Sequence, residues 1–157
     1  MNEIKVRINN ADLNLKVDPL RRLIDVLREE LNYTASKEGC GEGECGACSV
    51  IIDGELVNSC LIPIGKVEGK SILTLEGLKE TKKFDILENA FIDAGAVQCG
   101  FCIPGMIMAT EALLTKNPTP TEEEIRKGLS GNLCRCTGYK MIVEAVKLAS
   151  MRGEGIW

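Results

Sequence analysis

The chain has 157 residues, and its 19 basic and 23 acidic side chains give a formal net charge of −4, which excludes a general nucleic-acid binder with its cationic excess. Apolar residues make up 45% and charged residues 27%, a balance typical of a globular protein and not of a disordered one. The longest apolar run, residues 106–109, is far too short for a transmembrane helix, so we expect no membrane segment.

The N-terminal part shows the alternation expected of β-strands. Apolar residues alternate with polar ones over 4–8 and again over 13–17, and the polar stretch 9–12 between them predicts a hairpin turn. Asp18 and Pro19 then predict the start of a helix whose apolar face contains Leu20, Leu23, Ile24, Leu27 and Leu31.

A glycine-rich loop over residues 39–46 separates that helix from further strands. Residues 49–52 and 55–60 are expected to pair around an Asp53-Gly54 turn, and residues 71–75 form another short strand. Two hairpins and one helix indicate an α+β fold that ends near residue 78.

Beyond a polar segment, residues 79–83, the apolar period becomes helical. Four helices are expected: one ending at Gly95, one opened by Pro104, one with a Thr121/Glu124 capping box, and one beginning near Tyr139. We therefore predict a β-rich domain at 1–78, a linker at 79–83 and a four-helix domain at 84–157.

The chain has eight cysteines and no histidine. The lack of histidine excludes histidine acid–base catalysis, Rieske ligation and Cys/His zinc fingers. Because the N-terminal residues lack the apolar core of a signal peptide, we expect a cytoplasmic protein, whose thiols stay reduced. Metal ligation is then the leading explanation of the cysteines.

The first four cysteines have the spacing of a plant-type 2Fe–2S site, in which three ligands in one loop are followed by a distant fourth. They are Cys40, Cys45, Cys48 and Cys60. The glycines at 41, 43 and 46 allow the loop to approach a cluster closely and to direct amide N–H groups at its sulfurs. A four-cysteine zinc site is the alternative, although zinc sites are usually built from two close pairs.

The second set consists of two pairs, each expected just before a helix N-terminus, where the helix dipole lowers the pKa of a thiol. The pairs are Cys99 with Cys102, and Cys134 with Cys136. This spacing fits either an iron–sulfur cluster or zinc, and the single-residue gap between Cys134 and Cys136 favours the cluster.

Three motifs occur in order: residues 40–48 with Cys60, residues 98–106 and residues 131–139. Together they resemble the small 2Fe–2S iron–sulfur subunit of the molybdenum hydroxylase (xanthine dehydrogenase / aldehyde oxidase) family, and the resemblance covers essentially the whole chain. Ile103 stands where this family often has threonine, a difference that we interpret as a packing variation.

The resemblance implies a β-grasp ferredoxin-like domain followed by a four-helix bundle, each with one 2Fe–2S cluster ligated by one cysteine set. It also implies two partner subunits, a large one that binds the molybdopterin cofactor and one that binds FAD. Gln98 and Cys136 are expected to contact the pterin, Cys136 also being an iron ligand. The chain would relay electrons from molybdenum through both clusters to FAD and would have no substrate site of its own.

The substrate of such a complex is expected to be a purine or another N-heterocycle; an aldehyde, carbon monoxide or an aromatic acyl-CoA are the alternatives. A zinc-binding adaptor and a free-standing ferredoxin are competing functions. Ile156 and Trp157 are expected either to dock on a partner subunit or to fold back on the last helix.

Overall fold

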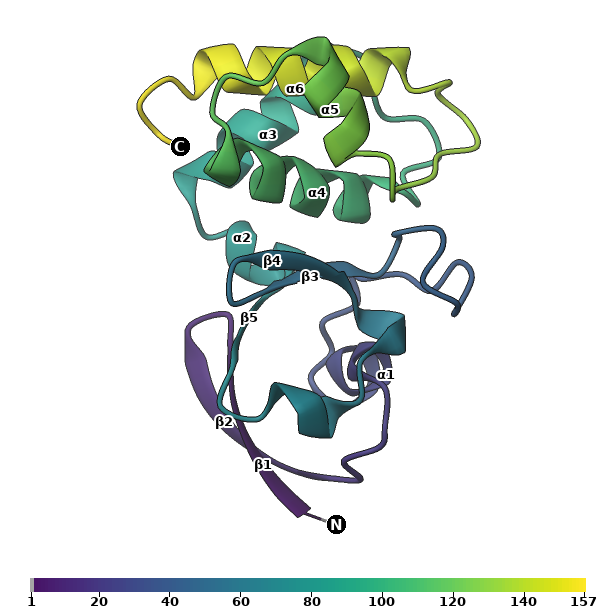
Figure 1. The fold of residues 1–157 in the computed structure, drawn as a ribbon, viewed down its shortest axis with the longest axis vertical. Coiled ribbons are helices and arrows are strands. Elements are labelled where there is room, and N and C mark those ends of the chain that lie inside the picture. Colours follow the sequence, from purple (N-terminus) through teal and green to yellow (C-terminus); the bar gives the residue numbers. More distant parts are fainter. Residues whose placement is uncertain (1) are drawn as a thin grey trace.

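The computed structural model describes residues 2–157 and contains a mixed five-stranded sheet with helices stacked against it, which confirms the expected α+β class (Figure 1). The strand order is β2-β1-β5-β3-β4, and all neighbours are antiparallel except β1 and β5. The strands are β1 Asn2–Ile8, β2 Ala11–Val17, β3 Ser49–Ile52, β4 Glu55–Asn58 and β5 Ser71–Leu73.

The β1–β2 hairpin forms as the alternation predicts, but its turn is shorter than the expected 9–12, because Ala11 and Asp12 already pair in β2. Ile4 pairs with Leu15 and Ile8 with Ala11, and the chain reverses through Asn9 and Asn10, both in the left-handed region at φ 50° and 67°. Asparagine tolerates this conformation better than most residues, which explains the turn.

The helix expected from Pro19 begins later than predicted. α1 spans Leu23–Asp25 and continues as a π-helical turn over Val26–Glu30. Asp18 instead closes a turn, since its side chain accepts the Leu20 amide, and Arg22 stays extended. Leu20, expected on the apolar face, is 78% exposed because it lies in this turn.

Five α-helices follow the fifth strand: α2 Leu75–Leu78, α3 Lys82–Asp93, α4 Ile103–Lys116, α5 Glu122–Gly128 and α6 Lys140–Arg152. Thr81 caps α3, so this helix begins within the polar segment 79–83. The Thr121/Glu124 capping box of α5 is present as predicted, and Gly95 follows α3 at φ 66°. No helix within residues 2–157 is long and apolar enough to cross a membrane.

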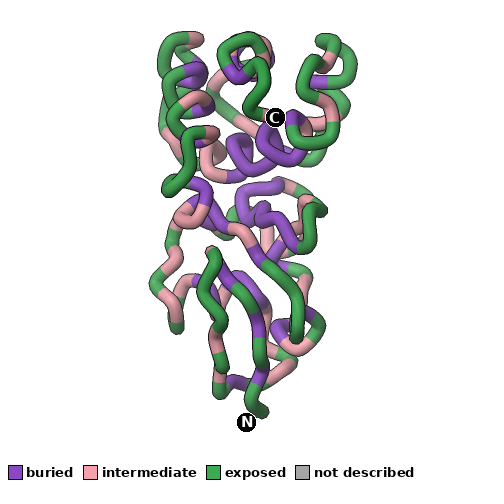
Figure 2. The backbone as a smooth tube through the Cα atoms, turned by 90° about the vertical axis from the view of Figure 1, so that its left-hand side faces the viewer, coloured by how far each residue is buried: buried purple, intermediate pink, exposed green. Residues whose placement is uncertain are grey.

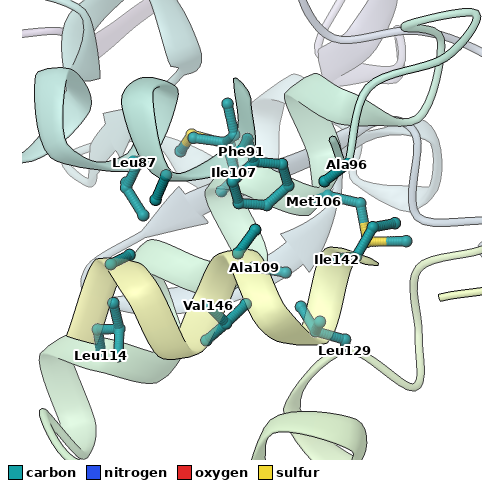
Figure 3. Packing of buried hydrophobic residues seen from close by; sticks show 14 of the residues in the cluster. Leu87, Phe91, Ala96, Met106, Ile107, Ala109, Leu114, Leu129, Ile142 and Val146 are labelled. Atoms are coloured by element: carbon teal, nitrogen blue, oxygen red, sulfur yellow. The ribbon is translucent and has the colours of Figure 1, made fainter. Parts of the chain in front are cut away.

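Buried segments lie both in the sheet region and among the helices (Figure 2). Most of the buried apolar side chains form two large hydrophobic clusters, one in the sheet region and one among the helices (Figure 3), and Ile24, Cys48 and Cys60 form a small third one. The helical cluster includes Phe91, Met106 and Val146, and it also takes in Ile51 of β3 and Leu78 of α2. Helix α4 lies along β3, so the helices rest directly on the sheet. This contact fixes how the two cysteine-bearing regions face each other.

The C-terminus folds back on the helices, which is the second of the two arrangements considered for Trp157. Its indole Nε1 donates to Glu111 Oε2 at 2.7 Å, and a Cβ on Gly153 would lie 1.9 Å from the indole ring. Glu111 is only 5% exposed and also accepts from Lys83 Nζ at 2.9 Å and Thr115 Oγ1 at 3.1 Å. Two helices, α3 and α4, and the C-terminal tail thus meet at one buried carboxylate.

Replacing Trp157 with phenylalanine should lower the free energy of unfolding by about 1–3 kcal/mol, because a hydrogen bond to a buried charged group is lost while an aromatic ring remains. Urea unfolding of the holoprotein measures the change. The neighbouring Ile156→Ala substitution is the control, since Ile156 is 43% exposed. If both variants lowered the free energy of unfolding equally, the hydrogen bond from Trp157 to Glu111 would contribute nothing to stability.

Candidate functional site

The loop that carries the first three cysteines has the glycine-dependent conformation expected from the sequence. Gly41, Gly43 and Gly46 all have positive φ values, of 68°, 75° and 73°. Only glycine adopts this left-handed region at little cost. The resulting curl leaves three backbone amides of the loop facing one sulfur atom.

That sulfur belongs to Cys40. It accepts hydrogen bonds from the backbone amides of Glu42, Glu44 and Cys45, at donor–sulfur distances of 3.3, 3.4 and 3.4 Å. Led by the bond from Glu42, these amides lower the pKa of Cys40 to about 7. The loop therefore stabilises a thiolate even without a metal ion, as a metal-ligating sulfur requires.

The first cysteine set is arranged in pairs. The thiol of Cys40 contacts that of Cys45, and the thiol of Cys60 contacts that of Cys48. Burial raises the pKa of Cys60 to about 11, so its thiolate needs a nearby positive charge, such as a metal ion would supply. Cys60 reaches this position from a 3₁₀ turn, Ser59–Leu61, because β4 ends at Asn58 and not at Cys60 as expected.

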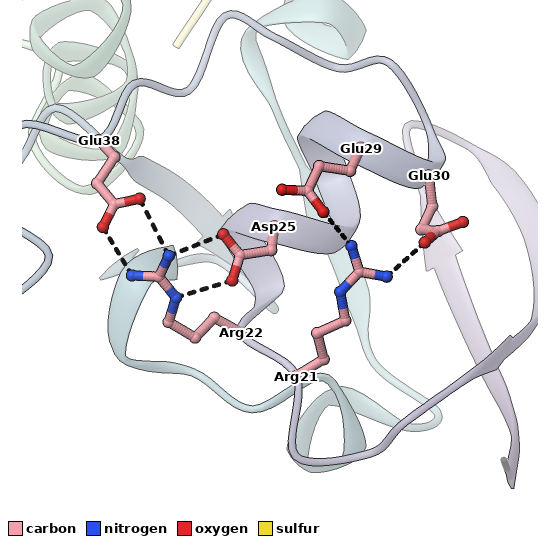
Figure 4. A network of polar contacts seen from close by, with 6 residues as sticks. All are labelled: Arg21, Arg22, Asp25, Glu29, Glu30 and Glu38. Carbon is pink, nitrogen blue, oxygen red and sulfur yellow. Dashed lines mark hydrogen bonds and ion pairs between the residues drawn. The ribbon is translucent and has the colours of Figure 1, made fainter.

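Arg22 forms ion pairs with two acidic side chains, one of which directly precedes this loop (Figure 4). Arg22 donates two bonds to the carboxylate of Glu38, at 2.7 and 3.0 Å, and two to Asp25, both at 2.8 Å. Its guanidinium lowers the pKa of Glu38. Such half-exposed pairs contribute little stability, but the bidentate geometry fixes the direction in which the chain enters the loop.

The second set is also arranged in pairs, although its members come from two distant segments. Cys102 is the N-cap of α4 and its thiol contacts that of Cys134, while Cys136 contacts Cys99. The expected effect of the helix N-terminus is not seen at Cys102, because burial raises the pKa of this thiol to about 12. The thiol of Cys99 likewise raises the pKa of Cys136.

Thr137 and Tyr139 support Cys134 and were not anticipated from the sequence. Thr137 directs its hydroxyl at the Cys134 sulfur at 3.1 Å and its amide at 3.5 Å. Burial alone would raise the pKa of Cys134, but these bonds bring it below its ordinary value. Tyr139, left-handed at φ 71°, accepts the Cys134 amide at its hydroxyl. The three-residue spacing from Cys134 to Thr137 is the sequence signal that could have indicated this contact.

All eight thiols are free, and within each set they contact one another in pairs. The two pairs of a set also lie close together, since, besides burial, Cys40 raises the pKa of Cys60 and, besides Cys99, Cys134 raises the pKa of Cys136. Within the described part of the chain, no three such side chains form a site for one metal ion. In a 2Fe–2S cluster with four cysteines, each iron takes two thiolates, so four pairs fit two such clusters. Gln98, Cys99 and Cys136 are exposed, which leaves this end of the second set open to a partner molecule.

Comparisons with known proteins agree with this chemistry. Residues 6–76 match the family described as a 2Fe-2S iron-sulfur cluster binding domain, and residues 74–147 match a second 2Fe-2S binding domain. The chain is 50% identical over 154 residues to the nicotinate dehydrogenase small FeS subunit of Eubacterium barkeri, covering 97% of this chain and 98% of that protein.

Two further relatives are similar in length to this chain. It is 48% identical over 145 residues to the xanthine dehydrogenase iron-sulfur-binding subunit of Escherichia coli O157:H7, covering 91% of each. A chain in the crystal structure of quinoline 2-oxidoreductase from Pseudomonas putida 86 matches with a TM-score of 0.89 and 41% identity, covering 98% of each chain.

Alanine at Gly46 should disrupt the first loop far more than alanine at another left-handed glycine. A Cβ at Gly46 would lie 2.4 Å from the Gly131 carbonyl oxygen, whereas a Cβ at Gly54 meets nothing within 4 Å. A left-handed backbone costs an alanine about 1–2 kcal/mol at either position. Only Gly46→Ala adds a steric clash, with the Gly131 carbonyl oxygen. Urea unfolding together with iron content measures the difference. Equal losses in the two variants would contradict the close approach.

Proposed function

Because the chain belongs to the family of small 2Fe–2S subunits of molybdenum hydroxylases, we propose that it holds two 2Fe–2S clusters and serves as the electron relay of such a complex. The observation that carries this proposal is the pairing of eight free thiols in two sets, with N–H and O–H groups directed at Cys40 and Cys134. Each cluster, when bound, accepts and releases one electron at a time.

The cysteine pairs suggest which sulfurs share an iron. In the first set Cys40 and Cys45 would bind one iron, and Cys48 and Cys60 the other. In the second set the pairs would be Cys102 with Cys134, and Cys99 with Cys136. A structural zinc ion instead takes all four thiolates around one centre, so this arrangement favours clusters over a zinc-binding adaptor.

Each set belongs to one structural region, and we propose the corresponding domains. Residues 1–78, with the sheet and the first set, form a β-grasp ferredoxin-like domain, and residues 84–157 form a four-helix bundle around the second. Residues 79–83 join them, although Lys82 and Lys83 already lie in α3. Hydrogen bonds to sulfur and burial of the thiols are the means by which each domain sets its reduction potential.

The partners follow from the exposed end of the second set. We propose that Gln98 and Cys136, both exposed, contact the pterin of a large molybdopterin-binding subunit, and that the first set faces an FAD-binding subunit. Exposed apolar side chains beside the second set, Val97 and Phe101 at 44% and 47%, support burial of this region in a complex. A free-standing ferredoxin would not need this apolar rim.

The complex, and not this chain, would select the substrate. Relatives named as nicotinate and xanthine dehydrogenase subunits support an N-heterocycle such as a purine, and aldehydes, carbon monoxide and aromatic acyl-CoA compounds are the alternatives. A cytoplasmic location is supported by eight free thiols, which need a reducing compartment.

The cluster assignment predicts about four irons and four acid-labile sulfides per chain in anaerobically purified protein. Cys45→Ser should remove the first cluster and destabilise the sheet region, because cluster binding is coupled to folding.

Cys134→Ala should remove the second cluster, leave the spectrum of the first intact and stop electron flow from molybdenum. Colourless protein that contains zinc would disprove the function, and wild-type turnover by Cys134→Ala would disprove the relay order.

The hydroxyl bond from Thr137 to Cys134 should raise the reduction potential of the second cluster. Thr137→Val removes this donor with little change of shape, and loss of about 0.5–1.5 kcal/mol of stabilisation lowers the one-electron potential by roughly 20–60 mV. Thr137→Ser keeps the hydroxyl and is the matched control. Redox titration followed by electron paramagnetic resonance measures the cluster potentials in both variants. A shift in the potential of the first cluster and not of the second would contradict the assignment of the Thr137 bond to the second cluster.

A further inference from the structure

The loops that carry the two cysteine sets are in direct contact. The Leu133 amide donates to the Cys45 carbonyl oxygen at 2.9 Å. Cys45 belongs to the first set, and Leu133 immediately precedes Cys134 of the second. A path of covalent bonds and one hydrogen bond therefore joins the two sets, although Cys45 and Leu133 are remote in the sequence.

The contact depends on an unusually close approach of backbone segments. A Cβ at Gly105, in the first turn of α4, would lie 2.4 Å from the Gly46 carbonyl oxygen. A Cβ at Gly46 would meet the Gly131 carbonyl oxygen at the same distance. Glycine is required at both positions, so the two loops and the start of α4 can pack without side chains between them.

One buried side chain fixes this packing. Asn132 is 4% exposed, and its Nδ2 donates to the Gly46 carbonyl at 3.0 Å and to Ser49 Oγ at 3.2 Å. Ser49 Oγ in turn donates to the same Gly46 carbonyl at 2.7 Å. Both partners belong to the first-cluster region, whereas Asn132 belongs to the loop of the second. Its amide group thus cross-links the two halves.

We propose that Asn132 is a positioning residue that sets the separation of the two clusters by fixing the Leu133–Cys45 hydrogen bond. The inference rests on the proposed function, since it concerns clusters bound by both cysteine sets. With clusters held by both sets, one electron would pass from the reduced centre in one set to the oxidised centre in the other. No bond is formed or broken and no proton moves. The rate of electron transfer therefore depends on the distance between the clusters and on the Leu133–Cys45 hydrogen bond that Asn132 fixes.

The test uses the full chain in its purified complex, with iron and sulfide measured first. Two reduced clusters are paramagnetic, and their magnetic splitting falls with the cube of the distance between them. Asn132→Ala should keep full iron content and the individual cluster spectra, while the splitting decreases and one-electron transfer between the clusters after photoreduction becomes several-fold slower. Hydrogen exchange at the Leu133 amide should become faster.

Asn89→Ala is the matched control. Asn89 is exposed on α3 and bonds only to the Asp85 carbonyl, so this variant should leave splitting, rate and exchange unchanged. If Asn132→Ala fails to retain iron, the milder Ser49→Ala variant, which removes one partner of Asn132, is judged by the same criteria. Wild-type splitting and rate in an iron-loaded variant would overturn the proposal, whereas wild-type protein without iron and sulfide would overturn the proposed function instead.

Discussion

Hydrogen bonds from backbone amides to thiol sulfur are the interaction on which the two candidate sites depend. An amide can face a sulfur only where the chain curls tightly, and this explains the left-handed glycines of the first loop. In the second site, Cys134 accepts one amide and the hydroxyl of Thr137, so a side chain supplies part of what backbone amides supply at Cys40. The sheet and the helices hold these irregular loops in place, since neither loop has a hydrophobic core of its own.

Most of the secondary structure could be predicted from local sequence signals. The β1–β2 hairpin, the α5 capping box and the Gly95 helix end all depend on residues within a few positions of each other, and all three were predicted. The predicted start of α1 was wrong, because a long-range contact with Pro63 holds the segment around Arg22 in an extended conformation. The position of Trp157 likewise depends on Glu111, which is remote in sequence.

The cysteine sets themselves were evident from spacing, but their electrostatics were not. Helix position suggested a low pKa at Cys102, whereas burial dominates there, and burial is a property of the packed fold. Asn132 belongs to the 131–139 motif, but a polar residue between glycine and leucine gives no indication of what its side chain contacts. Only the contact with Gly46, across 86 positions, shows what its side chain does.

The distribution of the cysteines along the chain has a consequence for biogenesis. The first set is complete within residues 40–60, and its supporting sheet is complete once β5 has been made. The second set has to wait for Cys136, and its loop docks on a surface that the first loop provides. During synthesis, the residues of the first set and of its sheet are therefore made before Cys136 leaves the ribosome, together with the surface on which the second loop docks.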